Sequence, residues 1–523
     1  MAAVASDAGR AENPWLITLA VMAGTFMVVL DTTVVNVSLP HIAGSLSASI
    51  EESTWALTSY LAANAIILPI TGWLANYFGR RRLLLVAVTS FTAASFMCGL
   101  APSLPILIFF RIIQGATGGV MQPLSQAIML EAFPPHERGQ AMALWGMGIV
   151  AAPIFGPVLG GWLTDTYSWR WIFYINIPIG VLSVVMIRAF IRDPHYIKRS
   201  SARIDAWGIG LLAVGIGALQ IALDKGQEDD WFSSRLIVTL LVVAVVGLAA
   251  FLMRELVIRD PVVDLRVFRL RTYTAGVLLI SLMGFVMYGS LVLHPVLLQT
   301  LLGYPPMQAG IAMAPRGIGT VLMMPLVGVL ISRMDPRGLL AAGLLIGAGS
   351  LFWFGHLSLD AGFANIVWPQ FVQGIGFGLL FVPLTTVTMD PIPKERMGNA
   401  TSLFNLLRNI GGSCGIATVE TMLARRQQVH TNVLGAHVNA YSLQTRTVLH
   451  GLAGHMAAAG SDATTATHRA LGAMFGLVER QASMLSFVDA FRLLGMIFLV
   501  TTPLVLLMKR PAAGPRPGAA VSE

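Results

Sequence analysis

The sequence predicts an all-α polytopic membrane protein, built from two six-helix halves with two further helices inserted between them. The first observation is composition: 55% of the 523 residues are hydrophobic and 11% are charged, whereas soluble domains have roughly 25% charged residues. The second is a series of fourteen apolar stretches, each long enough, at about 20 residues, to cross a bilayer as a helix. The third is an internal repeat that relates the first six stretches to the last six.

The fourteen apolar stretches define the predicted spans. They are residues 15–37, 52–74, 83–101, 104–126, 140–162, 170–190, 206–223, 235–253, 273–294, 309–331, 338–356, 365–389, 398–422 and 484–508. Because the number is even, both ends of the chain are expected on the same side of the membrane. The first stretch follows a polar segment and is longer than the apolar core of a cleavable signal peptide, so we expect it to remain as the first span.

Basic residues indicate which side that is. With the N-terminus placed in the cytoplasm, 22 of the 34 lysines and arginines lie in cytoplasmic segments and eight lie in outer ones. Short cytoplasmic loops carry such an excess of basic residues. We therefore expect a multi-pass protein of the bacterial inner membrane with both termini in the cytoplasm, and the net charge of +8 reflects this topology rather than a nucleic-acid partner.

The internal repeat sets the domain organisation. GWLANYFGRRRLL (72–84) matches GVLISRMDPRGLL (328–340), QGATGGVMQPL (114–124) matches QGIGFGLLFVPL (373–384), and PHERG (135–139) matches PKERMG (393–398). The predicted parts are a cytoplasmic tail (1–14), an N-terminal half (15–190), a linker with two extra helices (191–272), a C-terminal half (273–508) that includes an extracytoplasmic loop (423–483), and a second cytoplasmic tail (509–523). Repeated halves of this kind hold the substrate near the middle of the membrane, between them.

One aspartate stands out within the spans. Asp31 ends an uncharged run that begins at Trp15, although a carboxylate deep in the membrane costs about 2.5–3.5 kcal/mol on insertion scales. Arg111 lies at a similar depth, because each residue is about seven positions, or roughly 10 Å, below the outer end of its span. We predict that Asp31 and Arg111 neutralise one another, either as proton-coupling residues or as a fixed structural ion pair.

Other polar residues within or near the spans also have predicted roles or positions. Asp489 and Arg492 are three positions apart on one span and are expected to pair locally. His294 and His356 lie near span ends and are expected at the membrane interface. Glu420, near an outer end, is the alternative proton-carrying carboxylate.

Several stretches resemble the major facilitator superfamily, in particular its fourteen-span drug:proton antiporter branch and the EmrB-type exporters within it. The resemblance runs from LDTTVVNVSLP (30–40) to QASMLSFVDAF (481–491). GWLANYFGRRRLLL (72–85) is similar to the cytoplasmic loop motif between spans 2 and 3. Its candidate residues are Gly72, Asn76, Gly79, Arg80 and Arg81. The family usually has an aspartate where Asn76 stands, so a charge-relay latch is in doubt there, and the arginines serve either local pairing or topology alone.

Two further motifs lie on spans 4 and 5. LIFFRIIQGATGG (107–119) resembles the span-4 motif, whose arginine is associated with proton transfer and here is Arg111, followed by Gln114. GIVAAPIFGPVLGGWL (148–163) resembles the span-5 motif of the antiporter branches, through Pro153, Gly156, Pro157, Gly160 and Gly161. Small residues allow close helix approach and prolines bend a helix. Both properties suit a helix that closes the transport path in one conformation and bends in the other.

The C-terminal half contributes candidates for a substrate cavity. APRGIG (314–319) and NLLRNIGGS (405–413) are similar to stretches of the fourteen-span exporters. The cavity candidates are Gln114, Arg316, Asn405 and Arg408, with helix–helix contact as the alternative role of the two arginines. Because the spans hold four arginines and few acids, a cavity lined by them should favour neutral or weakly acidic lipophiles over dications.

The sequence argues against an enzyme. It has no GxxxxGK[ST] phosphate loop, no HExxH and no CxxC, so we expect no cofactor, no metal and no ATP drive. Cys98 and Cys414 are expected to pack as small apolar side chains. The two inserted spans carry no internal charge and are expected to face lipid. The long loop 423–483 is either an amphipathic helix over 463–482 or a solvated loop.

Taken with the resemblance, these observations predict proton-coupled export of lipophilic drugs and toxic compounds. The resemblance also implies a periplasmic adaptor protein and a TolC-type outer-membrane channel. One alternative is an uptake symporter or facilitator for a small amphiphile, against which the span-5 motif argues. The other is a transport-inactive sensor or scaffold, which would have no need of Asp31 and Arg111 within the membrane.

Overall fold

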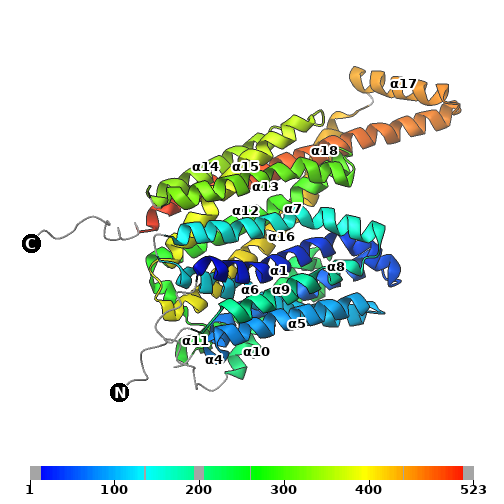
Figure 1. The fold of residues 1–523 in the computed structure, drawn as a ribbon. Coiled ribbons are helices and arrows are strands. Elements are labelled where there is room, and N and C mark those ends of the chain that lie inside the picture. Colours follow the sequence, from blue (N-terminus) through cyan, green and yellow to red (C-terminus); the bar gives the residue numbers. More distant parts are fainter. Residues whose placement is uncertain are drawn as a thin grey trace, which may run out of the picture.

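The computed structural model describes residues 13–134, 137–193, 205–258, 261–331, 333–439 and 441–509. In this part of the chain the structure is a bundle of long helices that run side by side, without a strand (Figure 1). The first helix begins and the last one ends at the same end of the bundle, which we call the N-terminal end, and a pair of helices protrudes from the opposite, hairpin end. The predicted tails 1–14 and 509–523 lie almost wholly outside the described residues.

Each predicted span coincides with a helix or with a broken helix. The N-terminal half contains α1 (Pro14–Ser45), α2 (Ile50–Ser53), α3 (Trp55–Ile67), α4 (Thr71–Phe78), α5 (Arg80–Leu100), α6 (Leu104–Ala132), α7 (Arg138–Thr166), α8 (Trp171–Tyr174) and α9 (Asn176–Phe190). The inserted pair is α10 (Ala206–Lys225) and α11 (Arg235–Val257). The C-terminal half contains α12 (Arg271–Val296), η3 (Leu297–Leu301), α13 (Pro306–Leu330), α14 (Pro336–Phe354), α15 (Phe363–Met389), α16 (Met397–His437), α17 (Leu443–Ala458), α18 (Ala463–Thr501) and η5 (Thr502–Leu507). Short 3₁₀ turns are η1 (Trp231–Ser233), η2 (Leu265–Arg269) and η4 (Lys394–Arg396).

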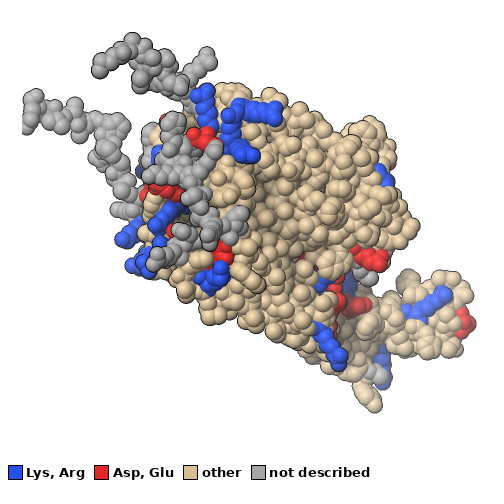
Figure 2. Space-filling view, turned by 90° about the horizontal axis from the view of Figure 1, so that it is seen from below, with Lys and Arg blue, Asp and Glu red and all other residues tan. Residues whose placement is uncertain are grey.

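Length and apolarity identify most of these helices as membrane-spanning. Among the described residues, 11 helices qualify alone, and α3 with α4, bent by 61°, makes up to 12. Of the remaining two predicted spans, α7 includes side chains outside the described part, and α16 carries Asn399, Asn405 and Arg408 along its length. Charged side chains gather toward the two ends of the molecule and leave an uncharged belt between them on the face that Figure 2 shows.

Helix ends follow from local chemistry. Asn13 accepts a hydrogen bond from the Trp15 N–H at 3.0 Å and, with Pro14 in the first turn, starts α1. Asp205 starts α10 by accepting from the Gly208 N–H at 3.0 Å. Its carboxylate also binds the Arg254 guanidinium, which lowers the pKa of Asp205 below its usual range. Gly79 separates α4 from α5 with φ 86°, a conformation that favours glycine.

The packing of the helices repeats between the halves. In the first half α3 packs on α6, α5 on α6, and α1 on α7; in the second half α13 packs on α15, α14 on α15, and α12 on α16. Each of these pairs is related to its counterpart by the internal sequence repeat. The domain boundaries themselves stay a prediction.

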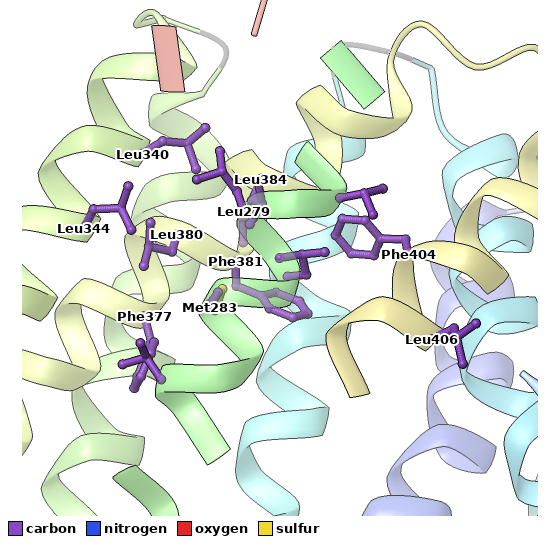
Figure 3. Packing of buried hydrophobic residues seen from close by; sticks show 14 of the residues in the cluster. Leu279, Met283, Leu340, Leu344, Phe377, Leu380, Phe381, Leu384, Phe404 and Leu406 are labelled. Carbon is purple, nitrogen blue, oxygen red and sulfur yellow. The ribbon is translucent and has the colours of Figure 1, made fainter. Parts of the chain in front are cut away.

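Leucines and aromatic side chains fill the C-terminal half. Figure 3 shows Leu279 of α12, Leu340 of α14, and Leu380 and Leu384 of α15 converging in one buried cluster. They leave a space of only about 10 Å³ between them, so this part of the half is close-packed like other protein interiors.

The two inserted helices differ from one another in how much they contact the rest of the bundle. α11 is lipid-facing as expected, since Val245, Val246 and Met253 are more than 60% exposed. α10 instead lies against both α3 and α16. Asp224 accepts a hydrogen bond from Thr58 of α3, and Gln220 donates to the Ser413 hydroxyl of α16 at 2.9 Å. α10 thus packs beside the two halves, as expected, while Trp207 and Val214 on it stay exposed at 74% and 54%; its polar contacts to both halves were not expected.

The segment 423–483 is helical rather than a solvated loop. α16 continues without a break to His437, α17 follows, and α18 begins at Ala463 and continues into the last span. These helices form the protruding hairpin in Figure 1, in which α17 packs on α18. Apolar side chains at the connection between α16 and α17 are exposed, with Tyr441 at 91% and Leu443 at 78%.

Close backbone approach within the C-terminal half gives the first test. A Cβ atom at Gly374 of α15 would overlap the Arg316 carbonyl oxygen of α13. Gly374→Ala should therefore lower the thermal stability of the purified protein, by about 1–3 kcal/mol for an overpacked core. Gly349→Ala is the matched control, because nothing lies within 4 Å of the Cβ it would add. Equal melting temperatures of the two variants would contradict the observed helix spacing.

Candidate functional site

Asp31 and Arg111 meet inside the N-terminal half. Asp31 lies on α1 and Arg111 on α6, and the Arg111 Nη1 donates to the Asp31 Oδ2 at 2.5 Å. Both side chains are 0% exposed. The predicted pairing is thus present in the structure, while its role in proton coupling stays a prediction.

Two amides complete the surroundings of the Asp31 carboxylate. Gln114 Nε2 and Asn176 Nδ2 both donate to the Asp31 Oδ1, at 2.9 and 2.8 Å. Asn176, at the start of α9, also donates to the Ser95 hydroxyl of α5 at 2.9 Å. Three helices of the half, α1, α6 and α9, therefore meet at one carboxylate, and α5 is linked to it through Asn176. The sequence analysis missed Asn176 and Ser95; an asparagine within an otherwise apolar span was the available signal.

The Arg111 guanidinium is held on its other sides as well. Its Nε donates to the Ala56 carbonyl of α3 at 2.9 Å, and its Nη1 also donates to the Gln114 Oε1 at 2.8 Å. The guanidinium lies 4.1 Å from the centre of the Tyr60 ring, a cation–π contact. Burying an ion pair costs several kcal/mol per ion unless further hydrogen bonds compensate, and these contacts supply most of them.

Residues of the C-terminal half reach across to the first half. Asn405 Nδ2 on α16 donates to the Gln126 Oε1 on α6 at 2.6 Å. One turn away, Arg408 Nη2 donates to the Gln122 Oε1 at 3.0 Å. Two of the cavity candidates therefore lie at the interface between the halves, where they bind glutamines that the sequence analysis did not single out.

A second buried polar cluster lies within the C-terminal half. Gln370 and Gln373 on α15 are 0% exposed, and neither side-chain amide has a hydrogen-bond partner among the described residues. They follow Arg111 and Gln114 by 259 residues in the repeat, so a neutral glutamine stands where the first half has its arginine. Arg316 on α13 also has a buried Nη1 without a partner in the described part.

His294 belongs to the interior and not to the membrane interface. It is 1% exposed and packs between the rings of Phe354 and Phe491, at 4.6 and 5.1 Å between ring centres. The interfacial prediction is therefore wrong for His294, because Phe354 of α14 and Phe491 of α18 cover it on both sides. His356 is exposed, as expected.

Asp489 does not pair with Arg492. Its Oδ2 instead accepts from Arg426 Nε at 2.6 Å and lies 2.8 Å from His430 Nε2, both on α16. The prediction of a local pair is wrong, since the neighbouring helix offers better-placed donors. Glu420 is half-buried and makes no hydrogen bond within the described residues.

The cytoplasmic loop motif joins α4 to α5 and contacts α6, α16 and the segment that follows α9. Gly72 lies against the backbone of α16, where a Cβ would be 2.5 Å from the Asn399 nitrogen. Arg80 is buried and pairs with Glu131 of α6. The Arg81 N–H donates to the Asp193 Oδ1 at 2.8 Å.

Glu131 and Asp193 thus supply the acidic partners of this motif. Asn76 makes no hydrogen bond in the part of the chain that the structure describes. The buried pairing of Arg80 speaks against a role in topology alone.

The span-5 glycines bring α7 against α1. A Cβ at Gly156 would overlap the Thr33 hydroxyl, and one at Gly160 would lie 3.1 Å from Val34. These contacts fall on the turn of α1 that follows Asp31. Gly161 faces open space, and the side chains of Pro153 and Pro157 lie outside what the structure describes.

The charged site is thus shared by membrane-spanning helices of one half. The described residues contain no group of three or more metal-ligating side chains, and the most deeply buried charges are an ion pair shared by spanning helices. The sequence model of the Major Facilitator Superfamily matches residues 21–416. The chain belongs to this superfamily, as predicted.

Similar proteins narrow the branch. The chain is 40% identical to the "Multidrug export protein EmrB" of Escherichia coli over 95% of each chain. It is 44% identical to the protein of the same name in Haemophilus influenzae, over 83% of this chain and 85% of the other. It is 40% identical to the "Fatty acid resistance protein FarB" of Neisseria gonorrhoeae, over 95% of this chain and 96% of the other. The predicted EmrB-like branch is confirmed.

Solved structures support the fold. The human organic anion transporter TETRAN aligns with a TM-score of 0.58 at 13% identity, covering 93% of this chain and 99% of the other. The proton:xylose symporter XylE aligns with a TM-score of 0.57 at 16% identity, covering 94% and 96%. At such low identity the likeness concerns the fold alone, and it confirms the predicted major facilitator architecture.

The buried pair gives the second test. Asp31→Asn removes the only charge that balances Arg111, and breaking one side of a buried pair costs about 3–5 kcal/mol. Asp31→Asn and Arg111→Gln should each lower thermal stability strongly, and the double variant should be less destabilised than the sum of the two. Thermal unfolding of the four proteins forms a double-mutant cycle. Strictly additive losses would mean that the two charges do not interact.

Proposed function

We propose that this protein exports lipophilic drugs and toxic compounds across the bacterial inner membrane in exchange for protons. The observation that carries the proposal is the fully buried Asp31–Arg111 pair, because a carboxylate with an arginine partner inside the membrane can bind and release a proton as its surroundings change. The names of the relatives, two multidrug export proteins and a fatty acid resistance protein, support the direction and kind of transport.

The proposed switch is the protonation of Asp31. With the pair intact, Asp31 is ionised and its helices are held together by Arg111, Gln114 and Asn176. When the halves rock and water reaches the site from the outside, a proton neutralises Asp31 and releases Arg111. Facing the cytoplasm, Asp31 loses its proton as substrate occupies the space between the halves. The span-5 glycines support this, since α7 touches α1 directly beyond Asp31.

The proposed substrates are neutral or weakly acidic lipophiles. Arg408 lies at the interface between the halves, and Arg316 has an unpartnered buried nitrogen among the described residues. These positive charges would repel dications and donate hydrogen bonds to an anionic group of a ligand. The side-chain amides of Gln370 and Gln373, which have no partner among the described residues, would donate hydrogen bonds to a ligand or accept them from it.

The proposed assembly involves a periplasmic adaptor and a TolC-type outer-membrane channel. In this arrangement both termini are cytoplasmic, the domain division falls at 191–272, and the hairpin formed by α16, α17 and α18 projects into the periplasm. Its exposed apolar side chains at the start of α17, Tyr441 and Leu443, belong to the surface that would meet an adaptor.

Proton coupling can be measured directly. In proteoliposomes with an imposed pH gradient, Asp31→Asn should abolish proton-driven substrate accumulation. The Asp31→Asn/Arg111→Gln variant should remain uncoupled even where its stability recovers, which separates coupling from folding. Glu420→Gln is the control and should keep its coupling. Loss of coupling in Glu420→Gln, with retention in Asp31→Asn, would move the proton site to Glu420 and leave Asp31 as a structural partner.

The same preparation decides between the rival functions. An uptake symporter would move substrate in the same direction as the protons, whereas the proposed exporter would move it in the opposite direction. A sensor or scaffold would move neither protons nor lipophilic dyes in any orientation.

The hairpin provides the test of assembly. Replacing residues 430–475 with a short Gly/Ser linker removes the protruding helices and leaves the spanning parts of α16 and α18. Transport into inside-out vesicles should continue, while resistance of intact cells to lipophilic compounds should be lost. Survival of both activities would show that the hairpin is not the docking site.

A further inference from the structure

A crevice at the base of the hairpin lies outside the proposed transport path. It occupies about 430 Å³ between α14, α16 and α18, and is lined by Phe352, Met422, Arg426, Asp489, Arg492, Leu493 and Met496. Within the C-terminal half α18 packs on both α14 and α16, and Figure 1 shows α18 continuing into the hairpin. The crevice is separate from the Asp31–Arg111 pair, which lies among helices of the other half.

From this crevice we infer a binding site for a single-chain amphiphile with an anionic head group, such as a fatty acid.

The charges of the crevice favour an anion. The Asp489 carboxylate is already engaged by Arg426 and His430, so it offers little to a cation. Arg492 is exposed and makes no hydrogen bond or ion pair with any described residue. One guanidinium is therefore free, and guanidinium groups bind carboxylates through two parallel hydrogen bonds.

The walls favour a hydrocarbon chain. Leu493 and Met496 continue along α18 below Arg492, and Phe352 and Met422 face them from α14 and α16. Methionine side chains adapt to chains of varied shape. Asp489 binds Arg426, which lies beyond the outer end of the predicted span 398–422, and Phe352 lies about 6 Å from the outer end of the span 338–356. Met496 is about 6 Å deeper along α18 than Arg492. The polar part of the crevice is thus nearer the membrane surface, which matches the polarity of a membrane-inserted amphiphile.

The volume argues for one chain. A space of about 430 Å³ falls within the range of roughly 300–1,000 Å³ that is usual for small-molecule sites. A phospholipid with two acyl chains would fill the crevice with one chain and leave the other outside. An exposed arginine near the membrane surface also reaches lipid phosphates simply by extending its side chain, so the experiment must separate the two sources of the anion.

The test uses photo-crosslinking in lipid nanodiscs. The full-length protein, in nanodiscs of zwitterionic lipid, is labelled with a diazirine derivative of laurate, and the labelled peptides are identified by mass spectrometry. Label is expected on residues 489–496 and 422–426. Unlabelled laurate should compete, whereas the methyl ester of laurate and dodecyltrimethylammonium should not, because neither carries the anionic group.

Three variants complete the test. Arg492→Gln should weaken laurate binding about tenfold, as expected for loss of a hydrogen-bonded ionic contact, and Met496→Trp should reduce labelling by filling the crevice without changing charge. Arg469→Gln, on the hairpin part of the same helix, is the matched control and should bind normally. Unchanged labelling of Arg492→Gln, or competition by phosphatidylglycerol as effective as that by laurate, would overturn the inference. Binding needs no proton gradient, so it should persist in Asp31→Asn, and its failure is distinguishable from failure of the proposed transport.

Discussion

The buried pair of Asp31 and Arg111 is the interaction on which the arrangement of the N-terminal half depends. Two charges 2.5 Å apart with no exposed surface need compensating hydrogen bonds, because the membrane interior and the protein core both solvate ions poorly. The compensation comes from Gln114, Asn176, the Ala56 carbonyl and the Tyr60 ring. Each of these groups fixes the rotation of the helix that carries it, so the charge pair determines how the helices face one another.

The second half is built on the same plan without the same charges. Where the first half has Arg111 and Gln114, the second has Gln370 and Gln373, and its interior relies on close contact of glycines and on large apolar side chains. Two halves with equal folds but different interiors would respond differently to the proposed proton. Such a difference suits a transporter in which one half senses the ion and the other contributes more of the surface for a lipophilic ligand.

Much of this could be predicted from the sequence because membranes restrict the choices. Apolar stretches of about 20 residues must be helices, so the positions of the fourteen spans follow from composition, and the depths of Asp31 and Arg111 follow from counting residues. Partners that come from distant helices could not be predicted in this way. Asp489 binds Arg426 and His430 rather than its helical neighbour, Arg80 and Arg81 take their acids from Glu131 and Asp193, and Asn176 joins the buried pair. Each depends on helix rotation, which the hydropathy pattern leaves open.

The unbroken course of α16 has a mechanical consequence. Its 41 residues correspond to a rod of about 60 Å, which starts near the N-terminal end of the bundle, touches α4 and α6 on its way, and ends in the hairpin. A rod of this length acts as a lever: a small tilt at its base becomes a large displacement at its tip. Because α18 packs on both α16 and α17, we expect these helices to move together. A rearrangement between the halves would therefore displace the protruding hairpin as one unit outside the bilayer.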